Sequence, residues 1–418
     1  MNYNNYAPPP NNGYNNQAPH MQQGYQQQGY PPQGQFGAVP QHGGQQGYAQ
    51  NPQLGYGAPP MRQGYDSYPQ QGYGAPQPGY QQNSPMPPQQ GYGNPVHQPQ
   101  TWVPPAPPFD PSYNADSDVE IIRKATKGFG TDEKALIHVL ARKSPAHTLQ
   151  LSERFEQLVG KSLVAVIEKE TSKWFSFGLV GCASGPLDWD VALLHRAMQG
   201  LGTHEDLLTE LLIGRSNGEI NELKYAYEKK YHRSLQAAVQ GDLSMKTERM
   251  FNMALTARRD EEYVPIDQAR VQADIHTLYG ASSKRLGTDE IQVCGIVLSR
   301  SDNHLRAVAQ GYAMSHRKTV PEMIRAEFSG HMRDALLHAM DGAIDRPTRD
   351  ANLLEESMAG MGTKDERLTY RVVRMHWDRA HTANVKARYQ HVFRKDLVSR
   401  IKGETSGDYE RLLVACLS

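Results

Sequence analysis

The chain has 418 residues, which is enough for two or more domains of ordinary size or for one large repeated fold. Its charge is balanced, with 44 Lys and Arg against 44 Asp and Glu, and this argues against binding to nucleic acid or anionic lipid through a basic surface alone. Three widely spaced cysteines (Cys182, Cys294 and Cys416) exclude a disulfide framework and a thiolate zinc site. The polar N-terminus predicts no secretory signal and no apolar stretch is long enough to cross a bilayer, so we expect a cytosolic protein.

Residues 1–110 consist almost entirely of Gln, Gly, Pro, Tyr and Asn, with Gly-Tyr pairs recurring along the segment. The segment has almost no aliphatic side chains to bury, so burial cannot offset an ordering entropy of roughly 1–2 kcal/mol per residue. We therefore predict a disordered tail. Its tyrosines favour weak multivalent contacts that lead to self-association or condensation, but a soluble spacer fits the same composition. The Pro-rich run at 103–108 is compatible with docking onto an aromatic groove of a partner and equally with a plain linker.

A short glycine-containing string recurs four times in the rest of the chain, and it decides the predicted fold. The copies are Gly128-Phe129-Gly130-Thr131-Asp132, Gly200-Leu201-Gly202-Thr203-His204, Arg285-Leu286-Gly287-Thr288-Asp289 and Gly360-Met361-Gly362-Thr363-Lys364. The second glycines are separated by 72, 85 and 75 residues, so each unit has the length of a small helical domain. Each threonine precedes apolar residues at helical spacing, as a helix N-terminus requires, and no unit shows a strand-like alternation. We therefore predict an all-α fold of stacked repeats.

The same spacing predicts where the units begin and end. After the tail we expect the first repeat at 111–182, the second at 183–258, a linker and the third at 259–343, and the fourth at 344–418. The extra length between the second and third glycine strings falls in a polar stretch that is typical of a connector.

An acidic residue follows each glycine string at a nearly fixed distance. The offset from the first position of the string is 42 residues in the first three units and 44 in the fourth, and the acids are Glu170, Asp242, Glu327 and Glu404. A Gly-x-Gly turn directs successive carbonyl oxygens toward one point, and a carboxylate completes a site for a hard cation such as calcium. One such string alone is typical of a helix-entry turn, but four copies nearly in phase predict calcium binding, with the first two units best supported.

The middle residue of every string is apolar: Phe129, Leu201, Leu286 and Met361. Apolar side chains at four equivalent surface turns indicate a contact surface, although packing of each against its own repeat is the alternative. Because three carbonyls and one carboxylate leave a calcium ion with open positions, a lipid phosphate is able to complete its coordination. The pattern predicts a calcium-bridged membrane contact in which the loop tips dip into the lipid interface.

The glycine strings, together with Gly403-Glu404-Thr405-Ser406-Gly407 near the C-terminus, resemble the annexin family over about residues 111–418. The resemblance implies four repeats of about five helices that form a curved disc, with calcium loops on its convex face. It also implies peripheral, reversible and calcium-dependent binding to anionic phospholipid membranes. The Gly/Tyr/Gln/Pro-rich tail is similar to those of long-tailed annexins and suits a fungal member.

By position, the resemblance implies a set of calcium ligands in each repeat. These are Thr126, Gly128, Gly130 and Glu170 in the first, Met198, Gly200, Gly202 and Asp242 in the second, Gly287 and Glu327 in the third, and Met358, Gly360, Gly362 and Glu404 in the fourth. Arg285 replaces the first glycine of the third string, which departs from the family pattern and allows a direct contact with phosphate instead. The longer spacing in the fourth repeat places two extra residues near 375–380.

Two further classes of function are compatible with parts of the sequence. The alternative is a scaffold whose tail forms condensates or recruits proteins, while the core only directs it to membranes. Deletion of the tail would distinguish this scaffold from a calcium-dependent membrane-binding protein. No enzymatic activity is expected, because the histidines and cysteines show no nucleophile–base or metal-ligand pattern. We expect calcium as the cofactor and no nucleic acid partner. We expect a monomer in solution, or a protein that self-associates through its tail. When calcium rises it should bind the cytosolic face of membranes and act in membrane traffic or organisation.

Overall fold

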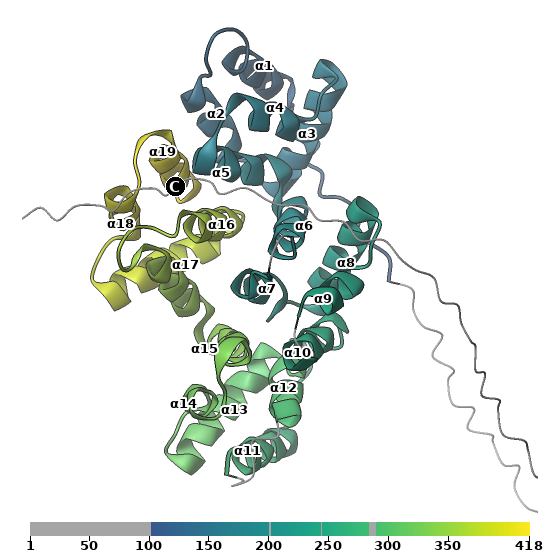
Figure 1. Cartoon of the computed structure of the whole chain (residues 1–418), viewed down its shortest axis with the longest axis vertical. Helices are drawn as coiled ribbons and strands as arrows, with labels where there is room; N and C mark the ends of the chain where they lie inside the picture. The colour runs from purple at the N-terminus through teal and green to yellow at the C-terminus, as the bar shows by residue number, and fades with distance from the viewer. Residues whose placement is uncertain (1–101, 200–201, 244, 284–289) are drawn as a thin grey trace, which may run out of the picture. The chain divides into compact units, whose positions relative to one another are not determined.

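The computed structural model describes residues 102–199, 202–243, 245–283 and 290–418. These residues form nineteen α-helices and contain no strand (Figure 1), which confirms the predicted all-α fold. The predicted disordered tail, residues 1–110, lies almost entirely outside the described part of the chain. None of the described helices is long and apolar enough to span a membrane.

The helices follow one another in four similar sets. The first set is α1 (Asp116–Ala125), α2 (Glu133–Leu140), α3 (Pro145–Val159), α4 (Leu163–Glu170) and α5 (Lys173–Ser184). The second is α6 (Pro186–Ala197), α7 (Glu205–Leu212), α8 (Asn217–Tyr231), α9 (Leu235–Asp242) and α10 (Met245–Leu255). The third is α11 (Gln268–Ser283), α12 (Glu290–Ser299), α13 (Asp302–His316), α14 (Val320–Glu327) and the first part of α15 (Gly330–Met358). The rest of α15 opens the fourth set, followed by α16 (Asp365–His376), α17 (Arg379–Phe393), α18 (Leu397–Glu404) and α19 (Gly407–Cys416).

The repetition extends to the ends of individual helices. The third helix of every set has 15 residues and begins after a polar residue whose side chain accepts a backbone N–H bond: Ser144, Ser216, Ser301 and Asp378. Such caps satisfy amide groups that have no partner inside the helix. Each of these helices also ends at a residue in the left-handed conformation, which stops it at the same length.

Helix α15 contains the junction between the third and fourth sets. Asp345 has φ −155° and ψ 82°, values that break the helix into two parts just before Pro347. We propose that the repeats meet at this bend, at Gly185 between α5 and α6, and in the segment between α10 and α11, close to the boundaries expected from the sequence. The fourth set has its two additional residues at α16, since α17 begins 14 residues after the start of α16 whereas α3 begins 12 residues after the start of α2.

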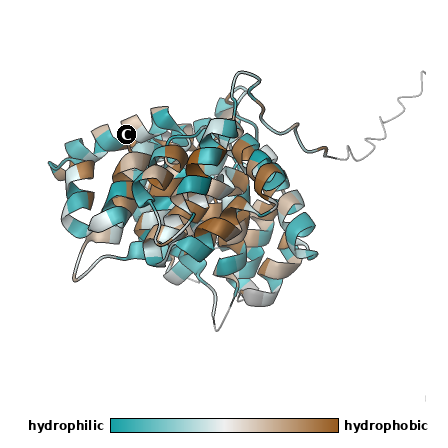
Figure 2. Ribbon diagram, turned by 90° about the horizontal axis from the view of Figure 1, so that it is seen from above, coloured by the Kyte–Doolittle hydropathy of each residue, from teal (hydrophilic) through white to brown (hydrophobic). Residues whose placement is uncertain are grey.

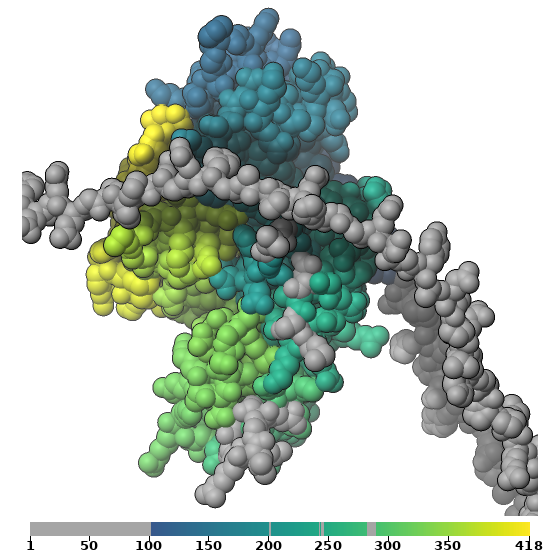
Figure 3. All heavy atoms as spheres, viewed as in Figure 1, coloured from purple at the N-terminus to yellow at the C-terminus, as the bar shows by residue number. Residues whose placement is uncertain are grey.

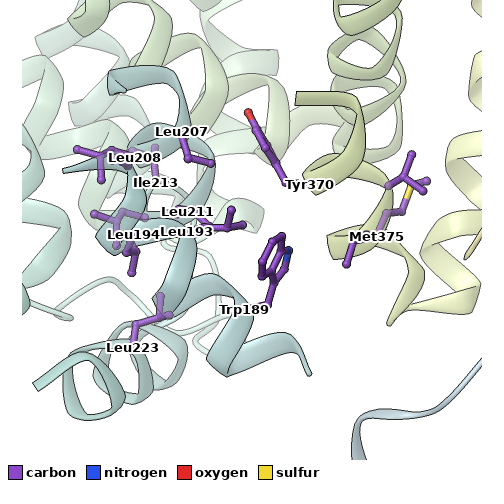
Figure 4. Packing of buried hydrophobic residues seen from close by; sticks show 14 of the residues in the cluster. Trp189, Leu193, Leu194, Leu207, Leu208, Leu211, Ile213, Leu223, Tyr370 and Met375 are labelled. Carbon is purple, nitrogen blue, oxygen red and sulfur yellow. The ribbon is translucent and has the colours of Figure 1, made fainter. Parts of the chain in front are cut away.

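The buried hydrophobic residues form one core cluster, and Figure 2 shows hydrophobic residues gathered where the helices meet, with hydrophilic ones more frequent toward the outside. Figure 4 shows one part of this core, where leucines of α6 and α7 lie on the side of Trp189 away from Met375, a residue of α16 in the same buried cluster. At roughly 25 cal/mol for each Å² of apolar surface removed from water, this burial is the main stabilising contribution to the helical stack. The three cysteines are free and buried in it.

The first and last sets of helices pack against each other through α5, α16 and α19 (Figures 1 and 3). The approach is close at Gly181, where an added Cβ would lie 2.8 Å from the Trp189 ring and 2.9 Å from a methyl of Val373. The Sγ atoms of Cys182 and Cys416 lie 3.7 Å apart in the same interface. A side chain larger than hydrogen at position 181 would therefore force Trp189 of α6 or Val373 of α16 to shift.

A buried ionic network joins the second set to the fourth. The Arg371 guanidinium contacts the Glu210 carboxylate, with Nη2 2.5 Å from Oε1, and the Tyr370 hydroxyl donates to the same carboxylate at 2.9 Å. Burial alone would lower the pKa of Arg371, but the adjacent Glu210 charge raises it above its ordinary value. Removing either partner would leave an uncompensated buried charge, so the pair fixes how these sets meet.

Candidate functional site

The first glycine string forms the loop between α1 and α2. Thr126 ends α1, and the Asp132 backbone N–H donates to the Ala125 carbonyl at 2.9 Å, which closes the loop across its base. The Asp132 side chain then caps α2 by accepting from the Ala135 N–H at 3.0 Å. The aspartate at the end of the string thus starts the next helix while the residues before it project outward.

Both glycines of this loop adopt positive φ angles, +108° at Gly128 and +86° at Gly130. A Cβ built on either glycine would meet no atom within 4 Å, so space is not what requires glycine here. The requirement is conformational, because side chains with a Cβ rarely adopt such backbone angles. The two glycines let the chain turn twice while the loop stays exposed to solvent.

The acid expected from the spacing lies against this loop. Glu170 is the last residue of α4, and the Thr131 hydroxyl donates to its backbone carbonyl at 2.9 Å. The Glu170 side chain is 25% exposed, and its ion-pair partner is Lys169, whose own side chain is 81% exposed and whose Nζ lies 3.4 Å from Oε1. An exposed lysine of this kind contributes little and is easily displaced from the carboxylate.

The oxygen atoms of the first loop suit a hard cation. No hydrogen bond within the described residues ends on the carbonyl oxygens of Thr126, Gly128 or Gly130. Helices α1 and α4 both end at this place, so the partial negative charges of two helix C-termini add to the Glu170 carboxylate. Three carbonyls without donors and one carboxylate form an all-oxygen set of the kind calcium prefers.

The loop of the second repeat has the same backbone closure. The His204 N–H donates to the Ala197 carbonyl at 2.9 Å, Met198 ends α6, and Gly202 has a φ of +95°. Asp242 is the last residue of α9, which is the position Glu170 has in α4. Gly200, Leu201 and the side chain of Asp242 lie outside the described residues, so this ligand set stays a prediction.

The third repeat is described only on the side of its acid. Glu327 is the last residue of α14, in the position that corresponds to Glu170. The glycine string itself, including Arg285, Leu286 and Gly287, lies outside the described residues. The predicted role of Gly287 and Glu327, and the alternative phosphate contact of Arg285, therefore stay predictions.

In the fourth repeat the loop between α15 and α16 repeats the geometry of the first. Gly360 and Gly362 have φ angles of +99° and +83°, and the Lys364 N–H donates to the Ser357 carbonyl at 2.8 Å. Glu404 is the last residue of α18, and the Thr363 hydroxyl donates to its carboxylate at 2.9 Å. Despite the longer spacing, the structure therefore brings Glu404 to the glycine loop.

An arginine that the sequence reasoning overlooked occupies this fourth loop. Arg400 Nη2 donates to the carbonyl of Met358 at 2.6 Å, and Nη1 donates to the Glu404 carboxylate. Hydrogen bonds from Arg400 and then from Thr363 hold the pKa of Glu404 below its usual value. Two of the four ligands predicted for calcium in this repeat are thus already bound to a cation of the chain itself.

The apolar tips of the two fully described loops point into solvent. Phe129 is 114% exposed and Met361 is 106% exposed, relative to the reference for each residue. Neither side chain packs against its own repeat, which was the alternative to a contact surface. The other two tip residues, Leu201 and Leu286, lie outside the described residues.

No group of three or more His, Cys, Asp or Glu side chains that could hold a metal ion occurs in the described part of the chain. The predicted ligand sets do not include such a group, since each consists of backbone carbonyls and one carboxylate. A site of this composition leaves coordination positions for outside ligands, unlike a closed cage of several carboxylates.

Comparison with known proteins identifies the repeated unit. The annexin family model matches four segments of the chain, residues 117–180, 189–253, 274–339 and 349–416. The chain belongs to the annexin family. The four matched segments each contain one of the glycine strings and one of the acids discussed above.

Individual annexins support the same conclusion. Annexin C1 of Cryptococcus neoformans var. grubii, a fungal protein, is 51% identical over 322 residues, which cover 75% of this chain and 68% of the relative. Annexin A4 of Rattus norvegicus is 36% identical over 307 residues, covering 73% of this chain and 95% of the relative. The solved structure of calcium-bound annexin (Sm)1 matches with a TM-score of 0.65 at 26% identity, covering 73% of this chain and 90% of that one.

Membership of the family carries general properties. Annexins bind calcium, bind anionic phospholipid membranes in a calcium-dependent manner as peripheral proteins, and are in general not enzymes. The resemblance inferred from the glycine strings is therefore confirmed. Which residues of this annexin bind calcium is a separate question, which its loop geometry addresses.

Proposed function

We propose that this annexin binds anionic phospholipid membranes reversibly when calcium enters the loop of its first repeat. The observation that carries the proposal is the loop itself: the carbonyls of Thr126, Gly128 and Gly130 have no hydrogen-bond donors among the described residues, and the backbone of the acidic residue Glu170 is bound to the loop by Thr131. By position, Met198, Gly200, Gly202 and Asp242 form the corresponding set in the second repeat. Gly287 and Glu327 are the corresponding positions in the third.

The charge of the folded part explains why an added cation is needed. Residues 111–418 contain 43 Lys and Arg against 42 Asp and Glu, so the repeats carry no net attraction for an anionic surface. Bound calcium supplies positive charge at the loop and coordination positions that a lipid phosphate can fill. The chain's own task is to hold its oxygens in place, which the turn at Gly128 and Gly130 and the Thr131 bond to Glu170 accomplish.

The exposed tip residues add an apolar contribution to the same contact. Phe129 leaves the first loop next to the carbonyls, and Met361 has the equivalent place in the fourth. Transfer of such a side chain from water into the lipid interface is worth on the order of 1.5–3 kcal/mol when burial is complete. The loops thus combine an ionic contact, which depends on calcium, with an apolar one, which does not.

The test is co-sedimentation of the full chain with phosphatidylserine-containing vesicles across a calcium titration. Wild-type protein should pellet with calcium and return to the supernatant when a chelator is added. The variant Glu170→Gln, Asp242→Asn should require more calcium, while Glu168→Gln, an exposed acid on the same helix, should behave as wild type. If wild-type protein fails to pellet even at millimolar calcium, the repeats have kept the fold without the binding chemistry.

We further propose that the tail modulates this activity through self-association or partner recruitment in membrane traffic or organisation. Its recurrent Gly-Tyr pairs and Pro-rich run support this role. The protein would act on the cytosolic face of membranes when calcium rises. The alternative is a condensate-forming or adaptor scaffold that the core only addresses to membranes. Deletion of residues 1–110 separates the two, because calcium-dependent lipid binding should survive it whereas the scaffold's assemblies should be lost.

A further inference from the structure

The fourth loop is bound by a cation that belongs to the chain. Arg400 lies on α18, one turn before Glu404, and its guanidinium reaches both the Met358 carbonyl and the Glu404 carboxylate. A third contact comes from Glu355, whose Oε2 lies 3.4 Å from Arg400 Nε and which accepts a bond from the Tyr389 hydroxyl. The Arg400 side chain is only 18% exposed, so it is held in the site and does not trail into solvent.

The other repeats have no charged side chain at this position. Four residues before the acid they carry Val166, Ala238 and Met323. Val166 is partly buried against the core, and its side chain has no hydrogen-bond donor to offer to the carbonyls or to Glu170. Among the four repeats only the fourth carries a charged residue at this sequence position, although its glycine turn, its threonine and its acid match those of the first.

We propose that Arg400 takes the place of calcium in the fourth repeat, so that this repeat keeps its loop closed without the ion and binds calcium more weakly than the first. The inference deepens the proposed function, because it decides which repeats of the membrane-binding surface respond to calcium. Its basis is that Met358 and Glu404, two of the ligands predicted from the family pattern, are already satisfied by the guanidinium.

Electrostatics and geometry both oppose a second cation in this loop. A calcium ion at the same ligands would meet the fixed positive charge of the guanidinium at close range, where the repulsion is only partly screened. Entry of calcium would require Arg400 to leave, which breaks its charge-assisted hydrogen bonds to Glu404 and Met358. Departure would also separate Arg400 from Glu355. In the first loop the corresponding cost, as far as the described residues go, is displacement of the exposed Lys169.

The test compares calcium binding by the full chain and its variants without membranes, measured by equilibrium dialysis with radioactive calcium. Arg400→Met keeps an unbranched apolar stem and removes the charge. We expect it to gain one calcium site, or to raise the affinity of the fourth site by about tenfold or more, equivalent to about 1.4 kcal/mol. Adding Glu404→Gln to Arg400→Met should remove this gain. Lys402→Met, which removes an exposed positive charge from the same helix, should leave binding unchanged.

The reciprocal substitution places an arginine in the first repeat at the position that Arg400 has in the fourth. Val166→Arg places the same side chain one turn before Glu170, and we expect it to lose the calcium site that Glu170→Gln also loses. This variant keeps the inference testable if Arg400→Met fails to fold, as judged by circular dichroism. The Val166→Arg variant keeps the Arg400 contacts, so its calcium binding does not depend on whether the fourth repeat folds without Arg400.

The outcomes separate this inference from the proposed function. If Arg400→Met binds no more calcium than wild type while Glu170→Gln loses a site, the proposal that Arg400 takes the place of calcium is disproved and the calcium site of the first repeat stands. If Val166→Arg keeps full calcium affinity, the inference is likewise overturned. If Glu170→Gln binds as wild type does, the proposed function fails at the first repeat, whatever the fourth repeat shows.

Discussion

The first and fourth loops of this annexin share a backbone conformation and differ in what satisfies their oxygen atoms. Each closes with a hydrogen bond spanning seven residues, each turns at two glycines with positive φ, and each ends near an acid at the C-terminus of a short helix. In the first loop the carboxylate of the acid pairs with an exposed lysine and with no other described residue, whereas in the fourth it is bound to Arg400 and Thr363. The proposal for Arg400 follows from this contrast: two loops of the same shape are expected to differ in calcium affinity because one already holds a cation of the protein.

The largest expected effect is a contrast between the two acids. Glu170→Gln should raise the calcium needed for vesicle binding on the order of a hundredfold at the first repeat, equivalent to about 2.7 kcal/mol, because the loop loses its carboxylate. Glu404→Gln should change it little, since the fourth carboxylate serves Arg400. Co-sedimentation with phosphatidylserine vesicles measures both, in a background with Asp242→Asn so that the second repeat does not mask the result. An equal loss in both variants would erase the distinction between the loops.

The next effect concerns the loop tips. Phe129→Ala should weaken vesicle binding at saturating calcium by about tenfold, because the ring loses an apolar contact worth on the order of 1.5–3 kcal/mol when fully buried. Met361→Ala should have a smaller effect, since methionine loses less area, and the Arg400 contacts hold its loop closed at any calcium level. Titration of the protein with vesicles at fixed calcium gives both values. Unchanged binding in Phe129→Ala would show that the ring stays outside the lipid.

The glycines are expected to affect both loops alike. Gly128→Ala and Gly360→Ala should each lower the free energy of unfolding by about 1–2 kcal/mol, because alanine does not tolerate φ angles near +100° and the surrounding space would otherwise accept a methyl group. Urea unfolding followed by circular dichroism measures the loss. Only Gly128→Ala should also reduce calcium affinity. A loss of calcium affinity in Gly360→Ala as well would contradict the assignment of the fourth loop to Arg400.

The smallest effect separates the two threonines. Thr131→Val removes a hydrogen bond to a backbone carbonyl, worth about 0.5–1.5 kcal/mol, whereas Thr363→Val removes a bond to the Glu404 carboxylate, worth about 1.5–3 kcal/mol before solvent exposure reduces it. We expect Thr363→Val to be the more destabilising of the pair in urea unfolding. Equal values would mean that the Glu404 carboxylate gains nothing from Thr363 in solution.

Much of this architecture could be predicted from the sequence, for identifiable reasons. The glycine strings set the period of the repeat, and helical spacing of apolar residues such as Leu136 and Leu140 indicated the all-α core, where both residues are buried. The constant distance from string to acid reflects three intervening helices of nearly fixed length, which is why Glu170 lies against its loop. The 44-residue spacing in the fourth repeat did not displace Glu404, because the two extra residues are taken up by a longer α16.

Arg400 could not be recognised from the motif, because the glycine string and the acid are both intact in the fourth repeat. The available signal was a charge four residues before the acid, at a position where the other repeats carry Val166, Ala238 and Met323. This signal is meaningful because residues one helical turn apart lie on the same face of a helix, so that a long side chain at position 400 can reach Glu404 and the predicted ligands beside it. A search of the sequence for calcium ligands does not detect a side chain of the same repeat that already binds those ligands.

The most direct test of the contrast between the loops is a crystal structure of the full chain grown with calcium in excess. The account predicts calcium bound to the carbonyls of Thr126, Gly128 and Gly130 and to Glu170, with Arg400 still bound to Met358 and Glu404 and no ion beside it. Calcium in the fourth loop with Arg400 turned away, together with a first loop that holds no ion, would contradict it.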